Sequence, residues 1–206
     1  DIAITAAIVI FQPELRRVLE RIGEKKIVSS LLPIDTNHVT ERFSDKTVNE
    51  IVKAASEMSR AKTGALIVIE QNVRLDEYER TGIVIDSVLT SQILINIFEH
   101  NTPLHDGAVI VRGNRIIAAT CYLPLSDNME LSKQLGTRHR AGVGISEVTD
   151  SVTIIVSEET GQVSVAQDGK LIRDISSSGL REILERSQNK KIIDNSKLRQ
   201  LLKGRI

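Results

Sequence analysis

Residues 101–140, NTPLHDGAVIVRGNRIIAATCYLPLSDNMELSKQLGTRHR, decide the fold of this chain. Two apolar runs, residues 109–111 and 116–122, stand on either side of Gly113-Asn114. Apolar runs joined by such a pair are typical of two antiparallel strands and a tight turn. The stretch therefore predicts a β-hairpin.

Polar side chains flank this hairpin. His105-Asp106-Gly107-Ala108 precedes it, and Thr137-Arg138-His139-Arg140 follows it. A hairpin can bring a carboxylate at its start near a basic cluster beyond its end. Metal-assisted chemistry on a phosphate needs that combination.

Periodicity and turn residues predict the elements on either side of the hairpin. The expected further strands are residues 65–70, 83–89, 151–156, 162–166 and 170–175. The expected helices are residues 12–22, residues 47–61 capped by Ser44 or Asp45, a turn at 75–80, a helix capped by Ser91 with Leu94, Ile95 and Phe98 inward, and residues 178–186. Residues 141–145 could continue a helix, although Gly142 and Gly144 weaken it and could instead let a ligand approach the backbone. The expected fold is one α/β domain, a central mixed sheet flanked by helices.

Composition excludes some function classes. The 206 residues include 27 basic and 27 acidic side chains and 2% aromatics. A general nucleic-acid binder should show a basic excess and stacking aromatics, so no nucleic-acid partner is expected. The single Cys121 excludes an intramolecular disulfide and a cysteine-based zinc site. Phosphate binding, if present, must be local.

The chain begins with Asp1, and residues 3–11 (AITAAIVIF) are apolar but too short to span a bilayer. One interpretation is a buried or docking helix. The other is the end of a membrane helix whose remainder precedes this sequence.

Each polar group has a structural and a functional interpretation. Asp106-Gly107 can mark an ordinary turn, or it can place a carboxylate beside backbone that approaches a phosphate. His105 can be a metal ligand or a structural histidine. The Thr137–Arg140 cluster can be a solvated helix face or a phosphate grip built from guanidinium groups.

Two further groups remain open in the same way. Ser157, Glu158 and Glu159 end a strand beside a turn, where acidic residues usually serve solubility and only sometimes bind metal. Tyr122 and Leu123 end the hairpin, and core packing is the default expectation for both. Tyr122 could instead stack on a base.

Together, three motifs give the chain a specific resemblance. They are His-Asp-Gly-Ala at 105–108, Tyr-Leu-Pro at 122–124 and Gly-Thr-Arg-His-Arg-Ala at 136–141. In order and spacing they resemble the diadenylate cyclase family, especially its membrane-anchored type. The resemblance runs from about residue 11 through the Asp168-Gly169 turn.

The resemblance implies a nucleotidyltransferase that makes cyclic di-AMP from two ATP molecules. It implies catalytic roles for Asp106, Gly107, Ala108, Arg138, His139 and Arg140. His105 and Asp106 would hold a divalent metal, Mn²⁺ or alternatively Mg²⁺ or Co²⁺. Substrate would be bound by Gly107, Tyr122, Leu123, Gly136, Thr137, Arg138, Ser157 and Glu159.

The resemblance also implies an organisation and partners. Residues 1–10 would be the remnant of a membrane-proximal segment, 11–175 the catalytic domain and 176–206 a C-terminal helical extension. A homodimer would be needed for catalysis, since the product is two-fold symmetric. The full-length protein would lie at the cytoplasmic face of the bacterial membrane, with a membrane-bound regulator as a further partner, and this chain would be soluble.

Three other functions compete with this one. A nucleotide sensor without turnover would use the same pocket but has little need of Asp106. A structural domain docking through residues 12–22 leaves the basic cluster unexplained. Another nucleotidyltransferase would differ only in its acceptor, and so in its product.

Overall fold

A computed structural model describes residues 42–129, 131–132 and 135–188, all within one compact unit of residues 39–206. The apolar residues 3–11, the expected helix at 12–22 and the tail beyond residue 188 lie outside the described residues. Within the described ranges, no helix has the length and apolar character that crossing a membrane requires.

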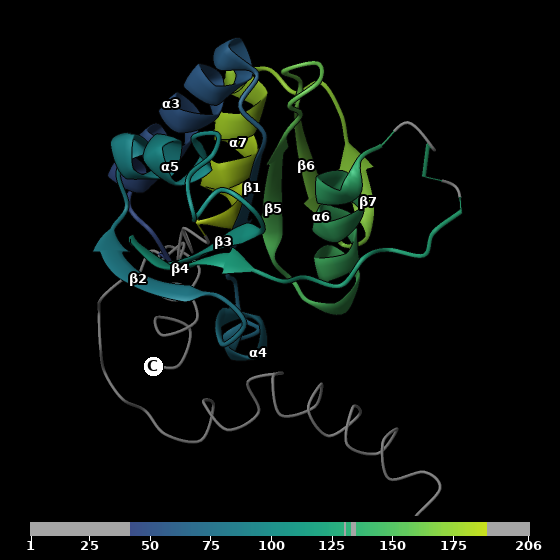
Figure 1. Ribbon diagram of the computed structural model, residues 1–206, viewed down its shortest axis with the longest axis horizontal. Coiled ribbons are helices and arrows are strands. Elements are labelled where there is room, and N and C mark those ends of the chain that lie inside the picture. The colour runs from purple at the N-terminus through teal and green to yellow at the C-terminus, as the bar shows by residue number, and fades with distance from the viewer. Residues whose placement is uncertain (1–41, 130, 133–134, 189–206) are drawn as a thin grey trace, which may run out of the picture. The chain divides into compact units, whose positions relative to one another are not determined.

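A seven-stranded mixed sheet forms the centre of the unit (Figure 1). The strand order is β2-β4-β3-β1-β5-β6-β7. Only β1 and β3 pair in parallel, and every other neighbouring pair is antiparallel. The strands are β1 (Ala65–Ile69), β2 (Ile83–Val88), β3 (Ala108–Arg112), β4 (Arg115–Cys121), β5 (Val152–Val156), β6 (Val163–Gln167) and β7 (Lys170–Ile172). The predicted hairpin is confirmed as β3 and β4, and so is the mixed sheet.

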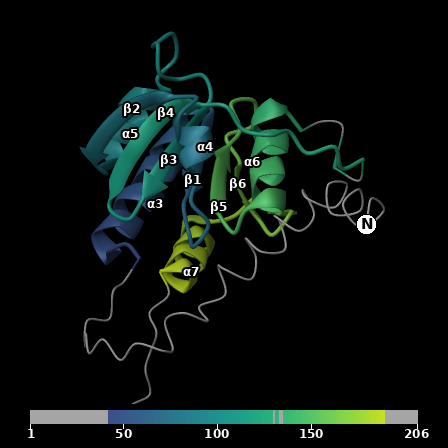
Figure 2. The same cartoon turned by 90° about the horizontal axis from the view of Figure 1, so that it is seen from below.

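Helices cover both faces of this sheet (Figures 1 and 2). They are α3 (Asp45–Ala61), α4 (Asp76–Glu79), α5 (Ser91–Phe98), α6 (Thr137–Val148) and α7 (Ser177–Ser187). Helices α3, α5 and α7 pack on one face, while α6 and the short α4 lie on the other.

The central strand shows why its sequence is apolar throughout. All five residues of β1 are buried. Leu66 and Val68 point to the α6 side, whereas Ile67 and Ile69 point to the α3 side. Because successive side chains of a strand face opposite ways, a strand covered on both faces needs a continuous apolar run.

Local capping sets the helix starts, with one correction to the prediction. The Ser44 side chain caps α3 by accepting a hydrogen bond from the Thr47 N–H. Helix α5 is capped by Thr90 and not by the expected Ser91, because the Thr90 hydroxyl accepts from the Ile93 N–H at 3.3 Å. The Ser91 N–H instead donates to Glu50 Oε2 at 2.6 Å, and this bond lowers the pKa of Glu50.

Helix α6 continues through both of its glycines. A Cβ at Gly144 would lie 2.8 Å from Ser126 N, and one at Gly142 would lie 2.9 Å from Ile155 Cδ1. Missing side chains therefore let the helix lie against the 123–126 segment and against β5. The alternative interpretation, that these glycines let a ligand approach the backbone, is wrong, because protein atoms lie where their side chains would be.

Helix α7 belongs to the same packed unit. Its Leu180 and Leu184 are 1% and 0% exposed and lie in the core shared with α3. Part of the expected C-terminal extension therefore contributes to the core beside the sheet.

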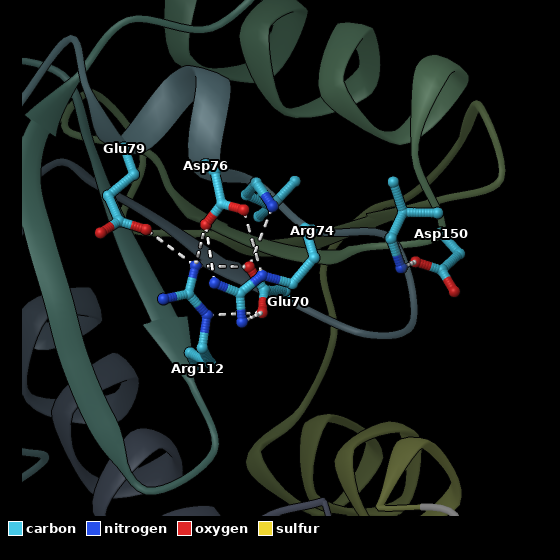
Figure 3. Close-up of polar contacts among 8 residues, drawn as sticks. Glu70, Arg74, Asp76, Glu79, Arg112 and Asp150 are labelled. Carbon is cyan, nitrogen blue, oxygen red and sulfur yellow. Dashed lines mark hydrogen bonds and ion pairs between the residues drawn. The ribbon is translucent and has the colours of Figure 1, made fainter. Parts of the chain in front are cut away.

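An ion cluster holds the carboxyl end of β1 to that of β3 (Figure 3). Arg112 donates from Nε to Glu70 at 2.6 Å and from Nη2 to Glu79 at 2.7 Å and to Asp76 at 3.1 Å. Glu70 is almost completely buried, with 4% of its side chain exposed. These bonds raise the pKa of Arg112, chiefly through Glu70.

Two more contacts order the loop after β1. The second oxygen of Glu70 accepts from the Leu75 N–H at 2.9 Å, just before α4. Asp150, labelled in Figure 3, accepts from the backbone N–H groups of Asn72 and Val73, each at 3.0 Å, and the figure draws one of these two bonds. This end of the sheet is thus fixed by buried and half-buried charges.

Candidate active site

Strand register places the polar residues of interest at one edge of the sheet. Since Ala65 pairs with Val156, the start of β1 lies beside the end of β5. Since Ala108 pairs with Cys121, the start of β3 lies beside the end of β4. Strands β1 and β3 are parallel, so all four ends meet at one edge. Asp106-Gly107, Tyr122-Leu123 and Ser157 to Glu159 all adjoin that edge.

A cavity of about 480 Å³ opens between the start of α6 and the end of β5. Six of the predicted site residues line it, namely Gly136, Thr137, Arg138, His139, Ser157 and Glu159. Sequence reasoning missed a role for Glu158 and for Arg173, which also line it. Arg173 follows β7 and carries no motif, so no local signal identified it.

The Arg138 side chain is paired with Glu158 in this cavity. Arg138 Nη1 lies 2.6 Å from Glu158 Oε2, and the two side chains are 21% and 51% exposed. Glu158 is therefore more than the turn-solubilising residue expected from the sequence. Arg138 also carries a buried Nε with no hydrogen-bond partner among the described residues.

His139 is buried beneath the same cavity wall. It is 8% exposed, and burial, together with the positive charge of Arg173, lowers its pKa from the ordinary 6.5, with Glu159 opposing. The imidazole is therefore mostly uncharged at neutral pH. The positive charges of the cavity lining come from Arg138 and Arg173, and Glu158 and Glu159 bring negative charges to the same lining. Arg140 is half-buried and lies outside the cavity lining, with its carbonyl accepting from the Ser126 N–H at 3.0 Å.

The start of α6 offers the cavity two backbone donors, the N–H groups of Thr137 and Arg138, which have no acceptor among the described residues, whereas the His139 N–H donates to the Gly136 carbonyl group at 3.1 Å. Gly136 is the N-cap residue and supplies no side-chain cap. The first N–H groups of a helix lack intrahelical partners and carry a partial positive charge, which favours phosphate. Thr137, the first residue of this turn, is exposed.

The residue that follows Asp106 must be a glycine, because of its backbone conformation and its close contacts. Gly107 has φ +104°, and a Cβ there would lie 2.8 Å from the Thr120 carbonyl carbon. Ala108 is fully buried as the first residue of β3. Asp106 itself is exposed and has no hydrogen bond or ion pair within the described part of the chain. Its carboxylate is accessible to a metal or a hydroxyl group.

His105 has one ring nitrogen committed to the backbone. Its Nδ1 lies 2.6 Å from the Thr102 carbonyl oxygen. Since a carbonyl only accepts, Nδ1 carries the proton and Nε2 keeps the lone pair that a metal needs. No group of three metal-ligating side chains occurs among the described residues. A metal at His105 and Asp106 therefore stays a prediction, and its other ligands would have to come from substrate phosphates and water.

Tyr122 and Leu123 separate in the structure. Tyr122 is 72% exposed, so the expectation of core packing is wrong for it. Leu123 is partly buried and packs against the core on the α6 side, as expected. Five other predicted site residues lie at the same edge of the sheet as the cavity but do not line it: His105, Asp106, Gly107, Tyr122 and Leu123.

A match to a known family assigns the chain to a class of nucleotide-binding domains. Residues 52–171 match the family described as "DisA bacterial checkpoint controller nucleotide-binding", abbreviated DAC. The chain belongs to this family, as the three sequence motifs indicated.

Relatives named for their activity agree with this assignment. The chain is 50% identical over 201 residues to the cyclic di-AMP synthase CdaA of Bacillus subtilis, covering 97% of this chain and 71% of that protein. It is 50% identical over 179 residues to a diadenylate cyclase of Listeria monocytogenes, covering 87% of this chain but only 64% of that protein. The chain thus spans about two thirds of these relatives.

Two solved structures share the fold. A double mutant of DacA from Staphylococcus aureus matches with a TM-score of 0.69 and 51% identity, over 70% of this chain and 97% of that one. A protein from Bacillus cereus described as a hypothetical membrane spanning protein matches with a TM-score of 0.62 and 34% identity, over 82% of this chain and 80% of that one.

Proposed function

We propose that this chain is a diadenylate cyclase that condenses two ATP molecules into cyclic di-AMP and two pyrophosphates. One observation carries the proposal: a cavity lined by Arg138 and the start of α6 lies at the same sheet edge as the exposed carboxylate of Asp106. Family membership and the two relatives at 50% identity support it.

The cavity suits a polyphosphate. Arg138 and Arg173 bring positive charge, Thr137 brings a hydroxyl group, and the first N–H groups of α6 bring backbone donors. In-line attack on an α-phosphate depends mainly on positioning and charge neutralisation. These groups would hold the triphosphate in line and balance the charge as pyrophosphate leaves.

Asp106 serves the attacking hydroxyl group. Its exposed carboxylate would accept the proton of the ribose 3′-hydroxyl group or hold a divalent metal there. With His105 Nε2, it would hold Mn²⁺, alternatively Mg²⁺ or Co²⁺, which would neutralise phosphate charge and lower the pKa of the hydroxyl group. Gly107 would let the nucleotide approach the backbone, and Tyr122 would stack on adenine above Leu123.

Ring closure requires a second copy of the chain. Each ATP supplies one nucleophile and one electrophile, so two sites must face each other across a two-fold axis. Exposed apolar side chains follow the end of β4 and suit such a contact: Tyr122, Leu125 and Met129 are 72%, 55% and 90% exposed. In the full-length protein, a preceding anchor would hold this domain at the cytoplasmic face of the membrane, within reach of a membrane-bound regulator.

Mass spectrometry of the products tests the proposal. The protein is incubated with ATP and Mn²⁺, with a chelator-treated sample as control. Cyclic di-AMP and pyrophosphate are expected, with two pyrophosphates released for each cyclic di-AMP formed. A linear dinucleotide would indicate another nucleotidyltransferase, and ATP bound without product would indicate a sensor.

A further inference from the structure

We propose that Glu158 forms an ion pair with Arg138 in the nucleotide-free protein. This pair breaks when ATP binds, and the Arg138 guanidinium group then contacts the substrate phosphates. The inference rests on the proposed function, because it concerns how that same cavity receives ATP. Glu158 is then a positioning residue that acts through Arg138.

The contact geometry shows the resting arrangement. Arg138 Nη1 donates a hydrogen bond to Glu158 Oε2 at 2.6 Å, and both side chains line the cavity. A triphosphate placed in this cavity would meet a carboxylate as well as a guanidinium group. Like charges repel at such range, so nucleotide binding and the intact Arg138–Glu158 pair oppose each other.

The buried Nε of Arg138 indicates that pairing with Glu158 does not satisfy every donor of the guanidinium group. Its Nε is buried without a partner among the described residues. A buried donor left unpaired is unfavourable, and a guanidinium group that moved to a phosphate could use two parallel N–H donors. The exchange replaces a half-exposed ion pair, a weak kind of contact, with a stronger charge-assisted one.

Gly64 makes the resting arrangement fit. It lies just before β1, and a Cβ there would stand 2.7 Å from Arg138 Nη1 and 2.8 Å from Glu158 Oε2. The ion pair therefore lies directly against the backbone at the start of the central strand. A methyl group at this position would displace the ends of both side chains, but it would neither remove nor add a charge.

Binding of 3′-deoxy-ATP by calorimetry tests the inference without turnover, because this analogue lacks the attacking hydroxyl group. Glu158→Gln should lower its Kd by about threefold to tenfold, the size expected for one exposed charge pair. In turnover assays the same variant should lower KM for ATP without lowering kcat. Glu182→Gln is the matched control, because Glu182 forms a similar exposed pair with Arg186 on α7 and should leave Kd unchanged.

Gly64→Ala separates release of the pair from simple charge repulsion. If the pair restrains Arg138, this variant should also tighten 3′-deoxy-ATP, although no charge changes. An unchanged or raised Kd in Glu158→Gln would overturn the inference, and tightening in Glu158→Gln alone would reduce Glu158 to a repulsive charge. A wild-type protein that binds no 3′-deoxy-ATP would instead overturn the proposed function.

Discussion

Unusual backbone conformations adjoin Asp106, one just before β3 and one within β4. Gly107 takes φ +104°, and facing it Thr120, a β-branched residue, takes φ +56° with its hydroxyl group buried and unpaired among the described residues. Such conformations are unfavourable for a β-branched residue and tend to occur at functional sites. The residues around Asp106 are therefore held by their surroundings and not by their own preferences.

Asp106→Asn should greatly reduce turnover and leave the fold intact. The change keeps the size of an exposed side chain but removes the basic carboxylate that would accept a proton, and the neutral amide holds a metal less well. A loss of about a hundredfold to ten-thousandfold in kcat is expected, as for a lost general base. Product formation and thermal unfolding are measured together.

Asp168→Asn is the control for this variant. Asp168 is exposed in the turn after β6, at the opposite edge of the sheet, and asparagine tolerates its φ of +51°. It should keep full activity. Full activity in Asp106→Asn would remove Asp106 from the mechanism.

At the same scale, sequence motifs predicted some side chains better than others. Asp106 and Arg138 stood out because each sits in an unusual local pattern. The Arg138–Glu158 pair joins residues 20 positions apart, and Arg173 reaches the cavity from beyond β7. Contacts of this kind depend on strand register, which single-residue patterns do not encode.

Among the elements, α6 shows tertiary packing overriding local preference. Two glycines lower the helical propensity of residues 141–145, so the sequence left that segment open. The helix forms because Gly144 allows close contact with Ser126 and Gly142 with Ile155. By contrast, α3 was predictable in full, since its cap and its apolar face lie within one segment.

The ion cluster at the far end of β1 gives an element-scale prediction. Arg112→Met should lower the free energy of unfolding by about 3 kcal/mol, because it leaves the buried Glu70 carboxylate with only the more distant guanidinium group of Arg74, at 3.8 Å. Helix α4 should loosen, since Asp76 and Glu79 also contact Arg112. Urea unfolding at neutral pH measures the change.

Arg115→Met is the matched control on the same hairpin. Arg115 pairs with the exposed Asp86, so its loss should cost at most about 1 kcal/mol. Adding Glu70→Gln to Arg112→Met should recover part of the lost stability. Equal effects of the two single arginine variants would contradict the assigned role of the cluster.

For the whole molecule, the sequence predicted the architecture well. Apolar runs predicted the strands, and turn residues separated them, so a mixed sheet flanked by helices followed. The core beside α7 was less evident, because Leu180 and Leu184 lie in a short helix that the sequence assigned to an extension. Which helices share a face depends on the strand order, and this emerged only in three dimensions.

Catalysis by facing sites predicts a dependence on protein concentration. If two copies must meet, the specific activity should rise with protein concentration and level off once the dimer dominates. Initial rates across about a hundredfold concentration range, with sedimentation in parallel, measure this. A specific activity independent of concentration, together with a monomer in sedimentation, would exclude facing sites.

The edge strand β2 has a consequence for the behaviour of the protein in a crowded solution. Ile83, Val84 and Val88 are at least half exposed there, yet the register shifts between Val84 and Ser87, where Asp86 takes φ +42°. An unbroken apolar edge is a template for uncontrolled strand addition, and an irregularity carrying a charge interrupts it. The bulge in β2 should therefore disfavour aggregation through this edge strand, so that self-association would use other surfaces.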